Sequence, residues 1–151
     1  MIEKLDLEDQ ETTMHILELQ TASYRIEADI IGFDRIPPLQ DTLYSLRECD
    51  EIFYGYYVGD ALAGIISYKI LGTVLDIHRV AVHPRFFRRG IADKLVRFVE
   101  GIDGGIEKIV VGTGKKNLPA VKLYLKNGYT AQRDVEISEG IYITEFLKEI
   151  R

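Results

Sequence analysis

The feature that most constrains the fold is a change of hydrophobic period around Gly90. Upstream, residues 74–82 (VLDIHRVAV) are rich in the β-branched and apolar residues typical of a strand. Downstream, the apolar residues of 91–102 recur at helical spacing. The segment between them, HPRFFRRG, is short and basic. The chain is therefore expected to pass from a strand through a tight cationic loop directly into a helix.

This loop is basic although the whole chain is acidic. The sequence has a formal charge of -5, yet residues 79–97 hold six lysines and arginines against one acid. Residues 1–51 hold 13 acids and 4 bases. The first N–H groups of a helix lack intrahelical partners and lie at the positive end of its dipole. Because Gly90 lets an anion approach them, the loop predicts a cradle for a diphosphate; the alternative is an ordinary solvated basic loop.

The rest of the sequence predicts one α/β domain, residues 1–151, with a mixed sheet covered by helices. A short strand at residues 1–6 should lead into a helix that has Asp6 as its N-cap and ends at Gly32. A second short helix is expected over residues 39–46. Further strands are expected at 52–58, 61–70, 107–112, 129–138 and 141–150, and a further helix at 117–127 with Asn117 as its N-cap.

Composition excludes several classes of protein. A sequence pI near 5.2 argues against nucleic-acid binding, which needs a broad basic face. No apolar run approaches the roughly 20 residues of a membrane span, and the N-terminus does not resemble a secretory signal. Cys49 is the only cysteine and the three histidines are scattered, so no metal site is predicted. We expect a cytoplasmic protein that does not bind a membrane.

A second pattern follows the basic loop at a distance. Asn117-Leu118-Pro119-Ala120 is followed by Leu123-Tyr124 and then by Gly128-Tyr129. With Val82-His83-Pro84 and the segment from Phe87 to Ala92, these residues resemble the signature of the GCN5-related N-acetyltransferase (GNAT) superfamily. That signature runs V-x-P, Q/R-x-x-G-x-G/A, and then N-x-x-A-x-x-L-Y-x-x-x-G-F/Y.

The resemblance is dense over residues 74–130, and the expected element order agrees along the whole chain. It implies a GNAT-like mixed, twisted β-sheet of about seven strands flanked by about four α-helices, with splayed parallel central strands. It also implies an acetyl-CoA-dependent N-acyltransferase. The acetyl group would pass to a primary amine, either a small amine or a lysine or N-terminal amine, by direct attack in a ternary complex.

The resemblance places acetyl-CoA, as co-substrate, in the gap between the splayed strands. The pantetheine arm would bond to backbone groups of residues 80–82, the diphosphate to N–H groups of residues 87–92, and Asn117 would also contact the cofactor. Phe87 departs from the family, which has Gln or Arg there, but backbone N–H groups should still hold most of the phosphate. The residues assigned to the cofactor are Val80, Ala81, Val82, Phe87, Arg88, Arg89, Gly90, Ile91, Ala92, Asn117 and Tyr124.

Tyr124 stands where the family usually places its general acid. A phenol with an unperturbed pKa near 10 stays protonated at pH 7 and can donate to the leaving CoA thiolate. The alternative is a tyrosine that only fills the core of a helix otherwise lined by Val121, Leu123 and Leu125. A carbonyl-polarising N–H would come from the backbone of strand 74–82.

Asp76 and His78 are the candidates for the base, because arylalkylamine members of the family carry paired histidines at these positions. A histidine suits the removal of an amine proton. The alternative is that both are ordinary polar residues with satisfied partners. With regular alternation Asp76 and His78 share a face with Val80, and Ile77 shares the other with Arg79, unless a β-bulge shifts the count.

The acidic N-terminal part is expected to bind the acceptor between the helices of residues 7–48 and the sheet. Its acids, Glu27, Asp29, Asp34 and Asp41, could attract a cationic amine or form a solvated face. The main rival is a non-catalytic acyl-CoA-binding or regulatory module, which Phe87 favours. Residues 112–116 (GTGKK) lack the spacing of a nucleotide-binding loop. A homodimer through the C-terminal hairpin is compatible with either function.

Overall fold

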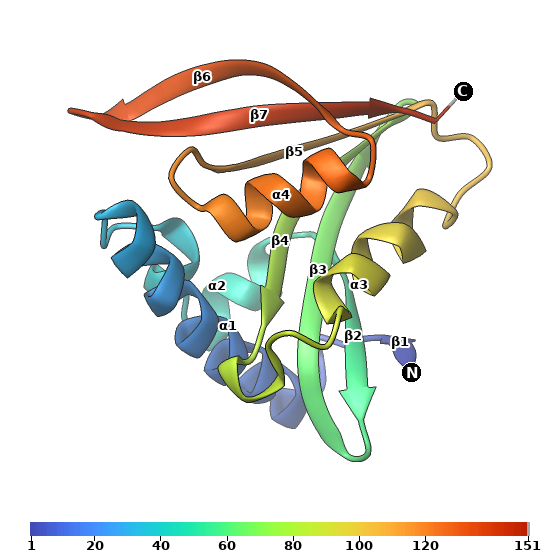
Figure 1. Cartoon of the computed structure of the whole chain (residues 1–151). Helices are drawn as coiled ribbons and strands as arrows, with labels where there is room; N and C mark the ends of the chain where they lie inside the picture. The colour runs from blue at the N-terminus through green and yellow to red at the C-terminus, as the bar shows by residue number, and fades with distance from the viewer. Residues whose placement is uncertain (151) are drawn as a thin grey trace.

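In the computed structural model, which describes residues 1–150, seven strands form one mixed sheet in the order β1-β2-β3-β4-β5-β7-β6 (Figure 1). This confirms the predicted mixed sheet, and four α-helices accompany it as expected. The strands are β1 (Ile2–Lys4), β2 (Ile52–Val58), β3 (Ala61–Leu71), β4 (Val74–Val82), β5 (Lys108–Gly114), β6 (Thr130–Ser138) and β7 (Ile141–Glu149). The helices are α1 (Gln10–Ile31), α2 (Leu43–Glu48), α3 (Ile91–Glu100) and α4 (Leu118–Lys126), with 3₁₀ turns η1 (Pro37–Gln40) and η2 (Pro84–Phe86).

The two central strands run parallel and then separate. β4 pairs with β5 from Val74↔Lys108 to Ile77↔Val111, and the pairing goes no further. β4 nevertheless continues to Val82 and stays paired with β3, while β5 continues beside β7. The predicted splay is therefore confirmed, and Figure 1 shows the two strands diverging from a common end. The separation leaves one edge of the last part of β4 without a neighbouring strand.

The helices bury their apolar stripes on opposite faces of the sheet. Leu19 of α1 and Leu46 of α2 belong to one buried cluster. Leu95 of α3 and Tyr124 of α4 belong to a second cluster, which includes Ile109 of β5. The separating ends of β4 and β5 thus lie between α1 on one side and α4 on the other. No helix of residues 1–150 is long and apolar enough to cross a membrane.

A β-bulge at His78 changes the faces expected along β4. Tyr68 pairs with Ile77 and Ser67 with Arg79, so His78 has no partner of its own on β3. Ile77 packs in the cluster with α3 and α4, whereas Arg79 turns to the face covered by α1. Regular alternation would have put these two residues on one face, but the β-bulge allowed for in the sequence analysis is present, and its extra residue shifts the two-residue period by one. Val80 is likewise separated from Asp76 and packs beside the α3 and α4 cluster.

The boundaries of the first helices also differ from the prediction. The N-cap residue of α1 is Asp9, not Asp6. Asp6 instead accepts a hydrogen bond from the Glu8 N–H at 2.9 Å in the turn before the helix. The short helix expected over residues 39–46 is divided into η1 and α2, because Thr42 and Ser45 form a capping box that starts a new helix.

Candidate active site

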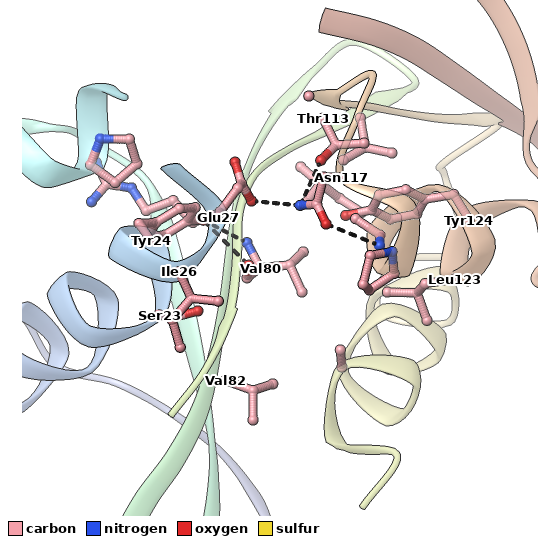
Figure 2. Close-up of a pocket in the computed structure, with 18 of the residues that line it drawn as sticks. Ser23, Tyr24, Ile26, Glu27, Val80, Val82, Thr113, Asn117, Leu123 and Tyr124 are labelled. Carbon is pink, nitrogen blue, oxygen red and sulfur yellow. Dashed lines mark hydrogen bonds between the residues drawn. The ribbon is translucent and has the colours of Figure 1, made fainter. Parts of the chain in front are cut away.

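A cavity of about 920 Å³ occupies the region where β4 and β5 separate. Figure 2 shows side chains of α1 and α4 facing each other across it. Three residues assigned to the site, Asp76, Ala81 and Arg89, do not line it. The other assigned residues do: His78, Val80, Val82, Phe87, Arg88, Gly90, Ile91, Ala92, Asn117 and Tyr124.

The loop before α3 places a helix N-terminus at one end of the cavity. Gly90 is the N-cap residue of α3 and has φ +73°. A Cβ at Gly90 would meet no atom within 4 Å, so the backbone conformation rather than crowding favours glycine there. Arg88 also has a positive φ, 65°, which is unusual for a residue with a side chain. The arrangement directs the unpaired N–H groups of the first helical turn, with Arg88 beside them, toward the cavity.

The unpaired edge of β4 is occupied by a tyrosine from α1. The Tyr24 hydroxyl accepts a hydrogen bond from the Val80 N–H at 3.2 Å and donates one to the Val80 carbonyl at 3.3 Å. Burial, followed by the charge of Glu27, raises the pKa of Tyr24, so the hydroxyl keeps its proton. Val82, two residues on, turns its backbone groups to the same side. The backbone predicted to bind pantetheine thus has Tyr24 as its partner here, a contact that local sequence patterns do not indicate.

Tyr124 packs in the core and also lines the cavity. Its ring lies 5.6 Å from that of Tyr129 and 5.6 Å from that of Phe146. Its hydroxyl forms no hydrogen bond within residues 1–150, and the residue lines the cavity. Burial, and then the charge of Glu27, raise the pKa of Tyr124. The phenol therefore stays protonated at neutral pH, as a proton donor requires.

Asn117 joins α4 to α1. Its Oδ1 accepts from the Ala120 N–H at 3.4 Å, which confirms the predicted N-cap. Its Nδ2 donates to Glu27 Oε1 at 2.9 Å and to Thr113 Oγ1 at 3.4 Å (Figure 2). Glu27 is half-buried, and burial raises its pKa against the opposing effect of the Asn117 hydrogen bond. The contact of Asn117 with a cofactor stays a prediction.

The two candidates for the base lie on the face of β4 covered by α1. His78 Nδ1 is 3.4 Å from Glu51 Oε2, and His78 Nε2 is 3.4 Å from Asp76 Oδ2. Asp76 is 54% exposed and lies outside the cavity. His78 lines the cavity but sits between two carboxylates. Their role as bases stays a prediction.

The buried guanidinium of Arg79 connects β4 to the segment between α1 and β2. Arg79 is 9% exposed and donates to Asp41 Oδ2 at 2.7 Å and to Glu51 Oε1 at 3.1 Å. It also donates to Gln20 Oε1 at 3.0 Å. Asp41 was expected only as one of several acids that could attract an amine, and its pairing with Arg79 was not predicted. Within residues 1–150, no group of three His, Cys, Asp or Glu side chains is arranged to hold a metal ion.

Comparison with known proteins adds the family context. The family model described as "Acetyltransferase (GNAT) family" matches residues 13–129. Among curated proteins, UPF0157 protein YqkA of Bacillus subtilis (strain 168) is 38% identical over 146 residues, which are 97% of this chain and 43% of that protein. The chain therefore spans less than half the length of this relative.

Solved structures share the fold over nearly the whole chain. The structure of smu.2055 from Streptococcus mutans UA159 has a TM-score of 0.82 at 16% identity, covering 100% of this chain and 99% of that one. The PaiA N-acetyltransferase from Thermoplasma acidophilum, in complex with coenzyme A, has a TM-score of 0.73 at 23% identity, covering 96% of each chain. At these identities the similarity establishes the fold alone.

Proposed function

Because the chain belongs to the GNAT family of acetyltransferases, we propose that it moves the acetyl group of acetyl-CoA onto a primary amine by direct attack in a ternary complex. The acceptor is a small amine or a lysine or N-terminal amine, and residues 1–151 act as one N-acetyltransferase domain. The observation that carries this proposal is the cavity between the separating ends of β4 and β5. It has the N-terminus of α3 at one end and Tyr124 in its wall.

The residues that line the cavity suit two parts of acetyl-CoA, its diphosphate and its pantetheine arm. The N–H groups of the Gly90 loop and the charge of Arg88 fit a diphosphate. The extended pantetheine arm would run along the free edge of β4 and meet the backbone of Val80 and Val82. The Tyr24 hydroxyl, which now bonds to Val80, would have to share that position or move. Because backbone groups supply most of these contacts, the phenylalanine at position 87 is compatible with binding.

The chemistry needs an amine nucleophile, a polarised carbonyl and a proton for the leaving group. The amine nitrogen bonds to the thioester carbon, the C–S bond breaks, and its electron pair goes to sulfur. Tyr124 donates its phenolic proton to that sulfur and regains a proton lost by the nitrogen. A backbone N–H of β4 stabilises the negative charge on the carbonyl oxygen. Each turnover of an ammonium substrate thus releases one proton to solvent.

The proposal is tested by following the release of free CoA from acetyl-CoA with a panel of amines. The panel contains n-pentylamine, 2-phenylethylamine, 1,5-diaminopentane, a lysine-containing peptide and a peptide with a free N-terminal alanine. An acetyltransferase releases thiol with at least one of them. The alternative, a non-catalytic acyl-CoA-binding module, predicts a thermal shift with acetyl-CoA and no thiol release with any amine. Absence of both responses would contradict both functions.

Tyr124→Phe tests the role of the general acid. We expect kcat to fall about 100-fold, with an unchanged acetyl-CoA dissociation constant, because only the donated proton is lost. The fold should tolerate the change, since the hydroxyl forms no hydrogen bond within residues 1–150. Tyr129→Phe is the matched control, because that neighbouring hydroxyl donates to Glu100 Oε2 at 3.0 Å and does not line the cavity. Unchanged turnover in Tyr124→Phe would refute the assignment.

A further inference from the structure

Glu27 differs from the other carboxylates of the cavity because it has no cationic partner among residues 1–150. Its hydrogen-bond donor is the neutral amide of Asn117, at 2.9 Å. A carboxylate removed from water is costly unless a cation or several hydrogen bonds compensate it. The other three carboxylates that line the cavity are compensated: Asp41 and Glu51 by Arg79, and Asp93 by Arg97 and Lys126.

The free oxygen of Glu27 can still accept a hydrogen bond. Asn117 occupies Oε1, whereas Oε2 forms no hydrogen bond within the described chain and is not sealed from solvent. Figure 2 shows Glu27 reaching from α1 toward Asn117, with Tyr124 beyond on α4. The charge of Glu27 is close enough to Tyr124 to raise the pKa of that phenol. A group bound to Oε2 would therefore lie near the proposed proton donor.

The surroundings of Glu27 favour a role as a proton acceptor. Burial raises the pKa of this carboxylate, and the Asn117 hydrogen bond opposes the rise only in part. A carboxylate with a raised pKa holds a transferred proton better than an exposed one. The titratable groups near it are Tyr24 on α1 and Tyr124 on α4. Near Tyr24 lies Arg79 of β4, which is paired with Asp41 and Glu51.

Building on the proposed acetyl transfer, we propose that Glu27 binds the ammonium group of the acceptor through Oε2 and takes its proton. The acceptor thus enters the cavity as a cation and compensates the buried carboxylate. One N–H proton passes to Oε2 and leaves a neutral amine, whose lone pair then attacks the thioester carbon. The second proton lost by the nitrogen restores Tyr124 after Tyr124 has protonated sulfur. Glu27 returns its proton to solvent when the product leaves.

The test compares Glu27→Gln with wild type, using the alkylamine of the panel that wild type turns over fastest, with n-pentylamine as first choice. We expect kcat/KM at pH 7 to fall about 100-fold while acetyl-CoA affinity, measured by calorimetry, is unchanged. Glu18→Gln is the matched control. It makes the same substitution on the same helix, but Glu18 is exposed and lies outside the cavity. We expect it to keep wild-type kinetics.

The pH profile separates proton transfer from a structural role. Wild-type kcat/KM should fall on the acid side as Glu27 becomes protonated. Glu27→Gln should lack this limb and rise with the fraction of neutral amine, so the two proteins converge at high pH. The defect should also be small for 2,2,2-trifluoroethylamine, which is already neutral at pH 7, and large for ethylamine. An equal defect with both amines, or parallel pH profiles, would overturn the proposal.

Thermal unfolding provides the second readout. The pKa of Glu27 is raised in the folded state, so its contribution to stability is present below its unfolded pKa and is lost as pH rises through the folded pKa. Glu27→Gln should therefore melt at or above the wild-type temperature at pH 8. A lower melting temperature with weaker acetyl-CoA binding would indicate a structural role and overturn the proposal. If wild type binds acetyl-CoA but acetylates no amine, the proposed function itself fails. If wild type acetylates an amine and the kcat/KM of Glu27→Gln stays within about twofold of the wild-type value, only the role proposed for Glu27 is refuted.

Discussion

The two sides of the cavity are built in different ways. The side proposed for the cofactor, the cofactor side, consists of residues between 80 and 92, a single segment that presents backbone N–H groups and the start of α3. The side proposed for the acceptor, the acceptor side, consists of α1, η1, Asp41, Glu51 and Arg79, and it is assembled from side chains far apart in the chain. Arg79 and Gln20, for example, are 59 positions apart, and Arg79 and Asp41 are 38 apart.

This difference predicts how each side responds to substitution. Backbone contacts depend on the path of the chain, so the cofactor side should tolerate side-chain changes such as the phenylalanine at position 87. The acceptor side depends on particular charged groups whose partners are buried with them. Substitutions there should therefore have larger effects, first on the free energy of unfolding and then on the positioning of the amine. Three substitutions test the comparison.

Arg79→Gln should have the largest effect on stability. It leaves the carboxylates of Asp41 and Glu51, which are 12% and 7% exposed, without their shared cation. We expect the free energy of unfolding, measured with urea, to fall by about 3–5 kcal/mol. Arg133→Gln is the control, because Arg133 pairs with Glu145 on the exposed hairpin, where solvent screening leaves an ion pair with little effect on stability. Equal losses in the two variants would contradict the comparison.

Gly90→Val should have an intermediate effect, on cofactor binding. Valine at a φ of +73° costs about 1–2 kcal/mol, so the loop would change its path and misdirect its N–H groups. We expect the dissociation constant of CoA, measured by calorimetry, to rise about tenfold. Gly72→Val is matched in strain, since Gly72 has φ +63° and a Cβ there would also meet nothing within 4 Å. Gly72 does not line the cavity, so that variant should bind CoA normally.

The same contrast explains what the sequence could predict. The strand, glycine and helix around Gly90 and the N-cap at Asn117 depend on neighbours a few residues away, so local patterns indicate them. The bulge at His78 depends on register with β3, and no residue type marks it. The partners of Glu27 and Arg79 meet only after the sheet and α1 have packed, so the sequence showed them merely as charged residues.

Local signals also failed where two of them compete. Asp6 and Asp9 are both suitable N-cap residues, and the spacing of the apolar residues in α1 does not distinguish them. The structure selects Asp9, while Asp6 caps a turn three residues earlier. Similarly, the leucines of residues 39–46 suggested one helix, but the capping box at Thr42 divides it. Such choices depend on hydrogen-bond geometry that hydrophobic spacing does not encode.

Tyr24→Phe should have the smallest effect, and its sign is informative because Tyr24 connects the two sides. Its hydroxyl, carried by α1, bonds to both the N–H and the carbonyl of Val80 on the edge proposed for pantetheine. Removing it should lower the free energy of unfolding by about 0.5–1.5 kcal/mol, the net value of a hydrogen bond. Acetyl-CoA should then bind up to about tenfold more tightly by calorimetry, because it no longer displaces the hydroxyl.

The opposite change in affinity would show that the two sides cooperate in binding. If acetyl-CoA binds more weakly to Tyr24→Phe, the hydroxyl must stay beside Val80 and contact the cofactor, so α1 belongs to the cofactor side as well. Tyr57→Phe is the control, because that phenol lies outside the cavity and forms no hydrogen bond within residues 1–150. Tighter binding by Tyr24→Phe alone would instead mean that the Tyr24 hydroxyl competes with the cofactor for the backbone of Val80.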